Sequence, residues 1–147
     1  GTPSATFSPA RTCSRAQCVT FLWRAVGSPE PKGTASFPDV QAGSYYEKAA
    51  QWAAEQGIVL GTSDGSFAPE ANVTRAQVVT FLYRLSKAEA TSTTSFSDVR
   101  ADSFCAESVA WAAENGITKG TTPTTFAPGR DCSRAQIVTF LYRYFAK

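Results

Sequence analysis

Three arginines occupy equivalent places in a segment that occurs three times, and they are the strongest candidates for binding chemistry. They are Arg15, Arg75 and Arg134. A guanidinium can bind a carboxylate or a phosphate through two parallel hydrogen bonds. Each arginine falls at what we take to be position N2 of a helix, where the helix dipole disfavours a cation by about 0.3–1 kcal/mol. The placement indicates an anion site at the helix start, with a surface arginine whose stem packs on a neighbour as the alternative.

The repeated segment has the features of a buried helix with a capped N-terminus. A serine or threonine precedes a glutamine by three positions, which is the spacing of a capping box. The caps are Ser14, Thr74 and Ser133, and the glutamines are Gln17, Gln77 and Gln136. Apolar residues then cover a wide arc of the helix, as in Val79, Phe81 and Leu82. We expect these three helices at the centre of the fold.

The chain divides into one half repeat and two whole repeats. Phe7, Phe67 and Phe126 mark the same loop position in the three copies. The linkers between copies are rich in Gly, Ser, Pro or Thr. The half repeat covers residues 1–27, and the whole repeats cover 37–86 and 96–147.

Each whole repeat also predicts a first helix, before the loop. These helices are expected at 45–56 and 104–115, with Ser44 and Ser103 as caps. Gly57 and Gly116 would end them in a Schellman motif, with Ile58 and Ile117 supplying its hydrophobic contact. Strand patterns are scarce, so the chain is expected to be all-α.

The composition describes a globular chain with little net charge. Of its 147 residues, 43% are hydrophobic, and the formal net charge is +2. This near-neutral balance argues against nucleic acid as a partner. No apolar run is long enough to span a membrane. Because the chain opens on Gly1 rather than Met, we expect a processed or trimmed fragment.

The four cysteines predict disulfides rather than a metal site. The chain has no histidine and no C-x-x-C pair, so zinc ligation is not expected, and no cofactor is indicated. We expect Cys105 to pair with Cys132, since both lie in the last repeat. Cys13 and Cys18 flank a helix start and could bridge. A partner for Cys13 upstream of Gly1, or free buried thiols, are the alternatives.

Several motifs in fixed order resemble the S-layer homology domain family. They are F-x-D-V, W-A-A-E-x-G-I, G-x-x-D-G-x-F-x-P and T-R-A-Q, and the resemblance covers the chain from Gly1 to about Phe145. It implies an all-α, three-pronged pseudo-trimer around a central helical bundle. It also implies an extracellular module at the bacterial cell surface or cell wall, which binds a secondary cell-wall polysaccharide non-covalently. The ligand group in this family is often the carboxylate of a pyruvylated terminal sugar.

The resemblance carries a set of site residues over to this chain. The arginines of the T-R-A-Q motif would line grooves between prongs, beside their cap residues. Loop glycines would approach the sugar closely. Two tryptophans could offer a stacking face, although a Trp at helical spacing is more often core. The full set is Arg15, Arg75, Arg134, Ser14, Thr74, Ser133, Gly61, Asp64, Gly65, Gly120, Trp52 and Trp111.

Two departures from the family pattern keep a second function open. Each copy has Gln where the family motif has Glu, which removes a carboxylate from the groove region. The first copy lacks its own F-x-D-V and W-A-A-E segment, so either the protein continues upstream or a helix from another chain completes the prong. The alternative is a structural or assembly module that self-associates through the incomplete repeat. An enzyme is not expected, because no histidine or recurring carboxylate pair is present.

Overall fold

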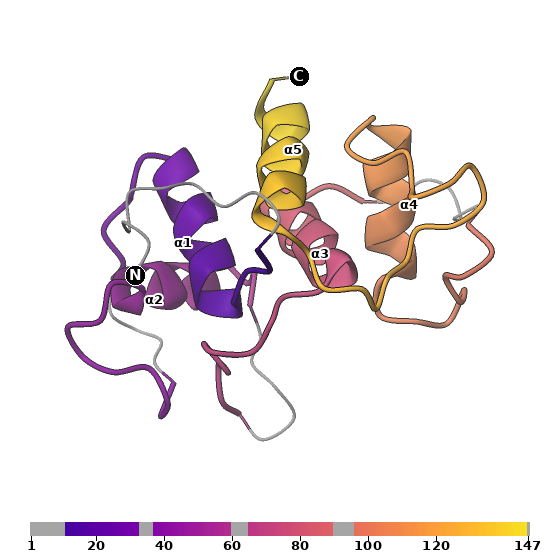
Figure 1. Ribbon diagram of the computed structural model, residues 1–147. Coiled ribbons are helices and arrows are strands. Elements are labelled where there is room, and N and C mark those ends of the chain that lie inside the picture. The colour runs from indigo at the N-terminus through magenta and orange to yellow at the C-terminus, as the bar shows by residue number, and fades with distance from the viewer. Residues whose placement is uncertain (1–10, 33–36, 60–64, 90–95, 147) are drawn as a thin grey trace.

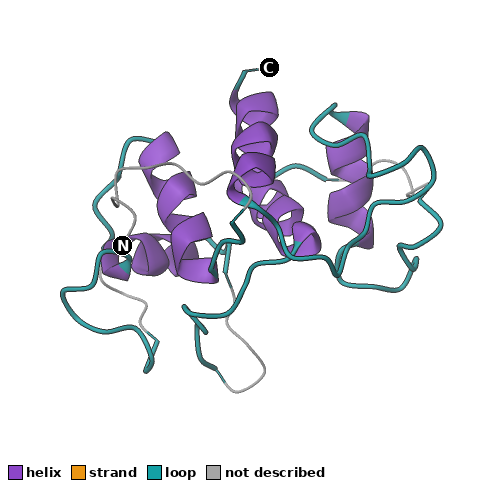
Figure 2. Ribbon diagram, in the orientation of Figure 1, coloured by secondary structure: helices purple, strands orange, loops and turns teal. Residues whose placement is uncertain are grey.

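The computed structural model describes residues 11–32, 37–59, 65–89 and 96–146, and these ranges contain five α-helices and no strand. Figure 1 shows how the helices are arranged, and Figure 2 shows that the described residues between the helices form loops and turns. The helices are α1 (Arg15–Ala25), α2 (Glu47–Glu55), α3 (Arg75–Ser86), α4 (Ala106–Glu114) and α5 (Arg134–Phe145). The all-α prediction is confirmed. No helix of the described ranges is long and apolar enough to cross a membrane.

Complete capping boxes begin α1, α3 and α5, as the sequence predicts. In α3, the Thr74 hydroxyl accepts a bond from the Gln77 N–H at 3.2 Å, and Gln77 Oε1 accepts one from the Thr74 N–H at 2.9 Å. Since Thr74 is the N-cap, Arg75 occupies position N1, so the prediction of N2 was one residue off. The same holds for Arg15 and Arg134.

The helices α2 and α4 begin later than predicted. Their N-caps are Tyr46 and Cys105, neither of which caps through its side chain, so the prediction of Ser44 and Ser103 was wrong. Ser44 instead belongs to turns before α2, where its N–H donates to Gln41 O and its carbonyl accepts from Glu47 N–H. Local turn bonds thus replace the expected cap.

Both of these helices end in the predicted Schellman motif. Gly57 has φ +75° and Gly116 has φ +71°. The N–H of Ile58 donates to Ala53 O at 2.8 Å, which is the bond that closes the motif. Ile58 and Ile117 are fully buried, so this hydrophobic contact anchors each helix end in the core.

A closed ring of three backbone hydrogen bonds joins the three repeats. The N–H of Cys13 donates to Cys132 O at 3.2 Å, that of Val73 to Cys13 O at 2.8 Å, and that of Cys132 to Val73 O at 2.8 Å. These three residues each immediately precede the N-cap of α1, α3 or α5. The ring therefore brings together the starts of the three equivalent helices. Its three bonds join equivalent residues of the three repeats.

The helix pairs cross the repeat boundaries. The second helix of one repeat packs against the first helix of the next, as α1 with α2 and α3 with α4, while α5 packs against α3. The loop phenylalanines Phe67 and Phe126 are the largest side chains that are fully buried. The core is therefore shared between consecutive repeats.

The four cysteines are buried free thiols, so the predicted Cys105–Cys132 and Cys13–Cys18 disulfides are not formed. Cys132 lies against Cys13 in the central ring, whereas Cys105 caps α4. Val73 takes the equivalent place in the remaining repeat, which indicates that the ring cysteines fill space as small apolar residues. Burial raises the pKa of the Cys132 thiol to about 12 and that of Cys18 even further.

Candidate functional site

Arg15 and Arg75 of the motif each reach the loop of the following repeat. Arg15 Nε donates to Phe67 O, and Arg75 Nε donates to Phe126 O, both at 2.8 Å. The Arg75 guanidinium also lies over two rings, 4.7 Å from the centroid of Phe126 and 5.3 Å from that of Phe140. These contacts give the arginines a structural role between repeats, which the sequence analysis did not predict.

Arg134 is the third member of this set. It is half-buried, and its Nε has no hydrogen-bond partner among the residues that the structure describes. The loop position equivalent to Phe67 and Phe126 is Phe7, which lies outside those residues.

The backbone N–H groups at the helix starts are occupied by the chain itself. In α3, Arg75 N–H donates to Arg130 O at 2.9 Å and Ala76 N–H donates to Pro128 O at 3.1 Å. Gln77 N–H bonds to the cap hydroxyl of Thr74 at 3.2 Å. The backbone N–H groups in the first three positions of α3 are therefore already bonded, which corrects the expectation that they are free to bind an anion.

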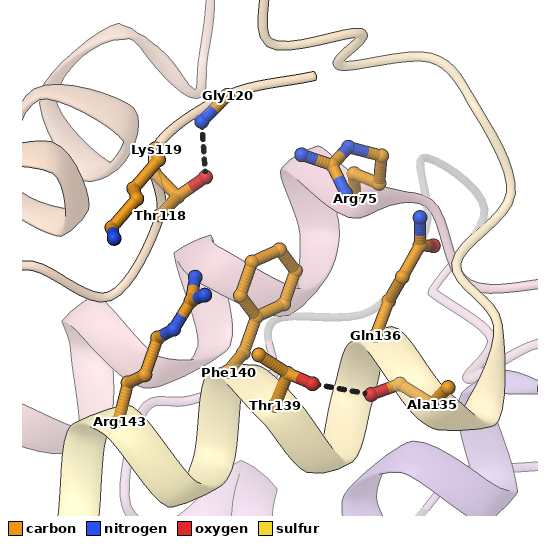
Figure 3. Close-up of a pocket in the computed structure, with 9 residues that line it drawn as sticks. All are labelled: Arg75, Thr118, Lys119, Gly120, Ala135, Gln136, Thr139, Phe140 and Arg143. Atoms are coloured by element: carbon orange, nitrogen blue, oxygen red, sulfur yellow. Dashed lines mark hydrogen bonds between the residues drawn. The ribbon is translucent and has the colours of Figure 1, made fainter. Parts of the chain in front are cut away.

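A cavity of about 190 Å³ lies where Arg75 meets the last repeat (Figure 3). The segment that follows α4 forms one wall, and one face of α5 forms another. Its lining residues are Arg75, Thr118, Lys119, Gly120, Ala135, Gln136, Thr139, Phe140 and Arg143. We call this cavity the α3–α5 pocket. In Figure 3, Arg75 lies on one side, Lys119 and Gly120 on the other, and Phe140 between.

The α3–α5 pocket carries positive charge without a balancing carboxylate. Arg75, Lys119 and Arg143 line it, and no lining residue is acidic. Arg143 is held in place because its Nη1 donates to Ile117 O at 3.2 Å. Burial lowers the pKa of Arg75, but an arginine remains a cation at any physiological pH. Cationic residues lining a concave, partly apolar surface suit a ligand with a carboxylate or phosphate group.

Gly120 is a residue that the pocket wall requires. Its φ is +84°, which an L side chain rarely adopts, and its N–H donates to Thr118 Oγ1 at 3.1 Å. A Cβ at this position would lie 2.5 Å from both Phe96 Cε1 and Thr125 O. Close packing therefore fixes the backbone that faces the pocket. Of the other predicted loop residues, Gly65 also has a positive φ, of +83°, while Gly61 and Asp64 lie outside the described residues.

The two tryptophans belong to the core. Trp52 is 5% exposed and Trp111 is 4% exposed. Trp111 packs between Tyr83 of α3 and Tyr144 of α5, with centroid distances of 5.5 and 6.0 Å. Neither ring offers an open face for sugar stacking, which corrects that part of the predicted site and leaves the alternative of a core role.

Sequence reasoning missed two groups of residues that shape the site. Lys119, Arg143 and Gln136 line the pocket but were not predicted, although Arg143 ends the repeated helix segment and offered a signal. Asp98 of the F-x-D-V motif accepts the backbone N–H groups of Phe126 and Ala127, each at 2.8 Å.

Partial desolvation raises the pKa of Asp98, but the hydrogen bonds from the N–H groups of Phe126 and Ala127 outweigh it. The pKa of Asp98 therefore lies below its usual value. Asp39 holds Phe67 and Ala68 in the same way. The recurrence of this aspartate could have identified its role in fixing the loops that receive the arginines.

The family model of the S-layer homology domain matches residues 36–79 and 95–138, which is more than half of the chain. The chain belongs to this family, as the motif resemblance predicts. Membership and the S-layer relatives place it at a bacterial cell surface or cell wall and support a role in cell-wall anchoring.

Similar proteins include surface-layer proteins and an enzyme. The chain is 31% identical to the surface-layer 125 kDa protein of Lysinibacillus sphaericus, over 69% of the chain and 9% of that protein. It is 38% identical to an endoglucanase of Bacillus sp. (strain KSM-635), over 57% of the chain and 9% of that enzyme. An S-layer protein of Bacillus thuringiensis subsp. finitimus is 27% identical over 96% of the chain and 18% of that protein. The chain thus spans less than a fifth of each of these relatives.

Proposed function

We propose that the chain anchors its protein to the cell wall by binding an anionic secondary cell-wall polysaccharide in the α3–α5 pocket. The observation that carries this proposal is that Arg75, Lys119 and Arg143 all line one cavity that has no acidic lining residue. A carboxylate of the glycan, such as that of a pyruvylated terminal sugar, would meet these cations. The proposal includes no catalytic step, and the absence of enzyme activity stays a prediction.

The neutral residues of the pocket would recognise the rest of the sugar. Gly120 presents backbone rather than a side chain, so a ring can approach closely. Gln136 and Thr139 offer an amide and a hydroxyl on the opposite wall. Phe140 supplies an apolar surface beside them. The predicted residues Arg75 and Gly120 remain in this proposal, whereas Thr74 acts as a cap. Arg15 and Arg134 would line further, non-equivalent grooves, and repeated weak sites would add avidity.

Calorimetric titration with purified wall polysaccharide tests this site through Lys119, which is exposed and serves no packing role. Reversing its charge in Lys119→Glu should weaken binding about tenfold, a loss of about 1.4 kcal/mol. Lys32→Glu is the matched control, since Lys32 is an exposed lysine outside the pocket. Equal binding by the two variants would refute the proposed site.

A second candidate function is assembly through the incomplete repeat, and the surface of α5 favours it. Val138 is 47% exposed and Tyr142 is 71% exposed on this helix. If other chains cover this surface, light scattering should show a mass that rises with concentration, and Val138→Asp should prevent the rise. Tyr45→Asp alters an aromatic that is 58% exposed elsewhere and is the control. A constant monomeric mass at high concentration would exclude self-association.

A further inference from the structure

The side-chain amide of Gln136 has its oxygen bonded to the helix start and its nitrogen free. Gln136 Oε1 accepts a hydrogen bond from the Ser133 N–H at 3.0 Å. A backbone N–H can only donate, so this bond identifies the oxygen end of the amide. No residue that the structure describes accepts a bond from Nε2, and in Figure 3 the side chain extends from α5 toward Arg75. Because Gln136 lines the α3–α5 pocket, Nε2 is a donor available to a ligand there.

The same arrangement recurs in the two earlier copies of the helix, which other helices cover. Gln17 Oε1 accepts a bond from the Ser14 N–H at 2.9 Å. Gln77 Oε1 accepts one from the Thr74 N–H, also at 2.9 Å. Neither glutamine has an acceptor for Nε2 among the described residues, although α2 packs on α1 and α4 packs on α3. Gln77 also lines a cavity, of about 380 Å³. The free amide nitrogen is therefore a property of the repeated helix start and does not depend on what covers α5.

Helix stability alone would favour glutamate rather than glutamine at this position. A capping box forms with either residue, because both offer an oxygen to the cap. A negative charge in the first turn also interacts favourably with the helix dipole. The helices α2 and α4 have Glu47 and Glu107 in their first turns, whereas α1, α3 and α5 have no acidic residue there. Folding therefore does not explain why all three capping boxes use glutamine.

The charge of the α3–α5 pocket gives a reason for the amide. A carboxylate at position 136 would be a counter-ion for Arg75, Lys119 and Arg143, and it would repel an anionic ligand. The amide leaves these positive charges uncompensated and adds an uncharged N–H donor. Carboxylate oxygens accept hydrogen bonds from guanidinium, ammonium and amide groups alike. The amide of Gln136 is thus a donor for an anionic group itself, not only for sugar hydroxyls.

We propose that Gln136 determines the charge specificity of the α3–α5 pocket, because its Nε2 donates to the anionic group that the pocket cations attract. The inference rests on the proposed function and assigns it a residue that selects the ligand by charge. The ligand class is a glycan whose carboxylate accepts bonds from Arg75 and from the amide together. Replacing this amide by a carboxylate would select against such a glycan and leave the helix start intact.

Calorimetric titration of Gln136→Glu with two preparations of wall polysaccharide tests this role. One preparation is intact, and the other is stripped of its carboxylate groups. The variant should bind the intact preparation about tenfold more weakly than the wild type, because a donor is lost and a like charge is added. Its affinity for the stripped preparation should stay the same, since a carboxylate still accepts bonds from sugar hydroxyls. Its Tm should not fall, because glutamate preserves the capping box.

Gln41→Glu is the matched control, since Gln41 is an exposed glutamine outside the pocket. It adds the same charge and should bind both preparations like the wild type. The inference alone is overturned if Gln136→Glu keeps the wild-type preference for the intact preparation while Lys119→Gln loses it. Equal weakening by Gln136→Glu and Gln41→Glu also overturns it, because net charge would then be the cause.

Two further outcomes separate this role from others. If Gln136→Glu lowers Tm and weakens binding of both preparations equally, Gln136 has only a structural role and the inference fails. If the wild type does not distinguish the two preparations, the proposed function fails, and the inference fails with it.

Discussion

Replacing Gly120 by alanine should destabilise the domain by two separable effects. The positive φ of +84° costs an L-residue about 1–2 kcal/mol. The new Cβ would also lie 2.5 Å from Phe96 Cε1 and Thr125 O, and 2.7 Å from Thr122 O. Two of these neighbours are backbone atoms that cannot rotate away, and overpacking of this kind costs about 1–3 kcal/mol. The free energy of unfolding should therefore fall by about 2–5 kcal/mol.

Gly116→Ala is the control that isolates the steric part. Gly116 has a φ of +71°, but a Cβ there would meet nothing within 4 Å. This variant should lose only about 1–2 kcal/mol, the conformational part. Urea unfolding followed by circular dichroism gives the midpoint urea concentration of each variant. The two midpoints can be compared when the unfolding free energies depend equally on urea concentration. If Gly120→Ala is no less stable than Gly116→Ala, the packing of the pocket wall around Gly120 is not as described.

Two further predictions concern ionisable groups. Because the pKa of Asp98 is lowered in the folded state, its carboxylate stabilises the domain above the unfolded pKa, and this contribution is lost as pH falls through the folded value. In urea unfolding at several pH values, Asp98→Asn should therefore be less stable than the wild type at neutral pH, and the two stabilities should converge below about pH 4. A difference in stability that does not change with pH would contradict this prediction. Cys132, with a pKa of about 12, should resist alkylation in the folded state, and four thiols should react only after unfolding. Rapid native labelling of Cys132, or a mass change on reduction, would contradict the free buried thiols.

The local elements of the fold followed from the sequence because short-range chemistry determines them. The spacing of Thr74 and Gln77 predicted the capping box, and Gly57 followed by Ile58 predicted the Schellman motif. The helix caps of α2 and α4 were not predictable in this way. Tyr46 and Cys105 have no capping side chain, so their place depends on turns and packing.

The site depends on long-range contacts, which explains why it was predicted only in part. Arg75 was recognisable as an unusual residue at a helix start, but its partner Phe126 lies 51 positions further along the chain. Lys119 has no counterpart in the T-R-A-Q motif, and it lines the pocket from the segment that follows α4, while other lining residues come from α3 and α5. The cysteine pairing failed for the same reason, since the ring joins Cys13 to Cys132 across the repeats.

The most direct test of the proposed anchor is calorimetric binding of two preparations of wall polysaccharide, one intact and one stripped of its carboxylate groups. The wild-type chain should bind the intact form about tenfold more tightly or better, and Lys119→Gln should reduce that preference several-fold while Lys32→Gln keeps it. If Lys119→Gln retains the whole preference, or if the wild type does not distinguish the two preparations, the α3–α5 pocket does not bind the anionic group of the wall glycan.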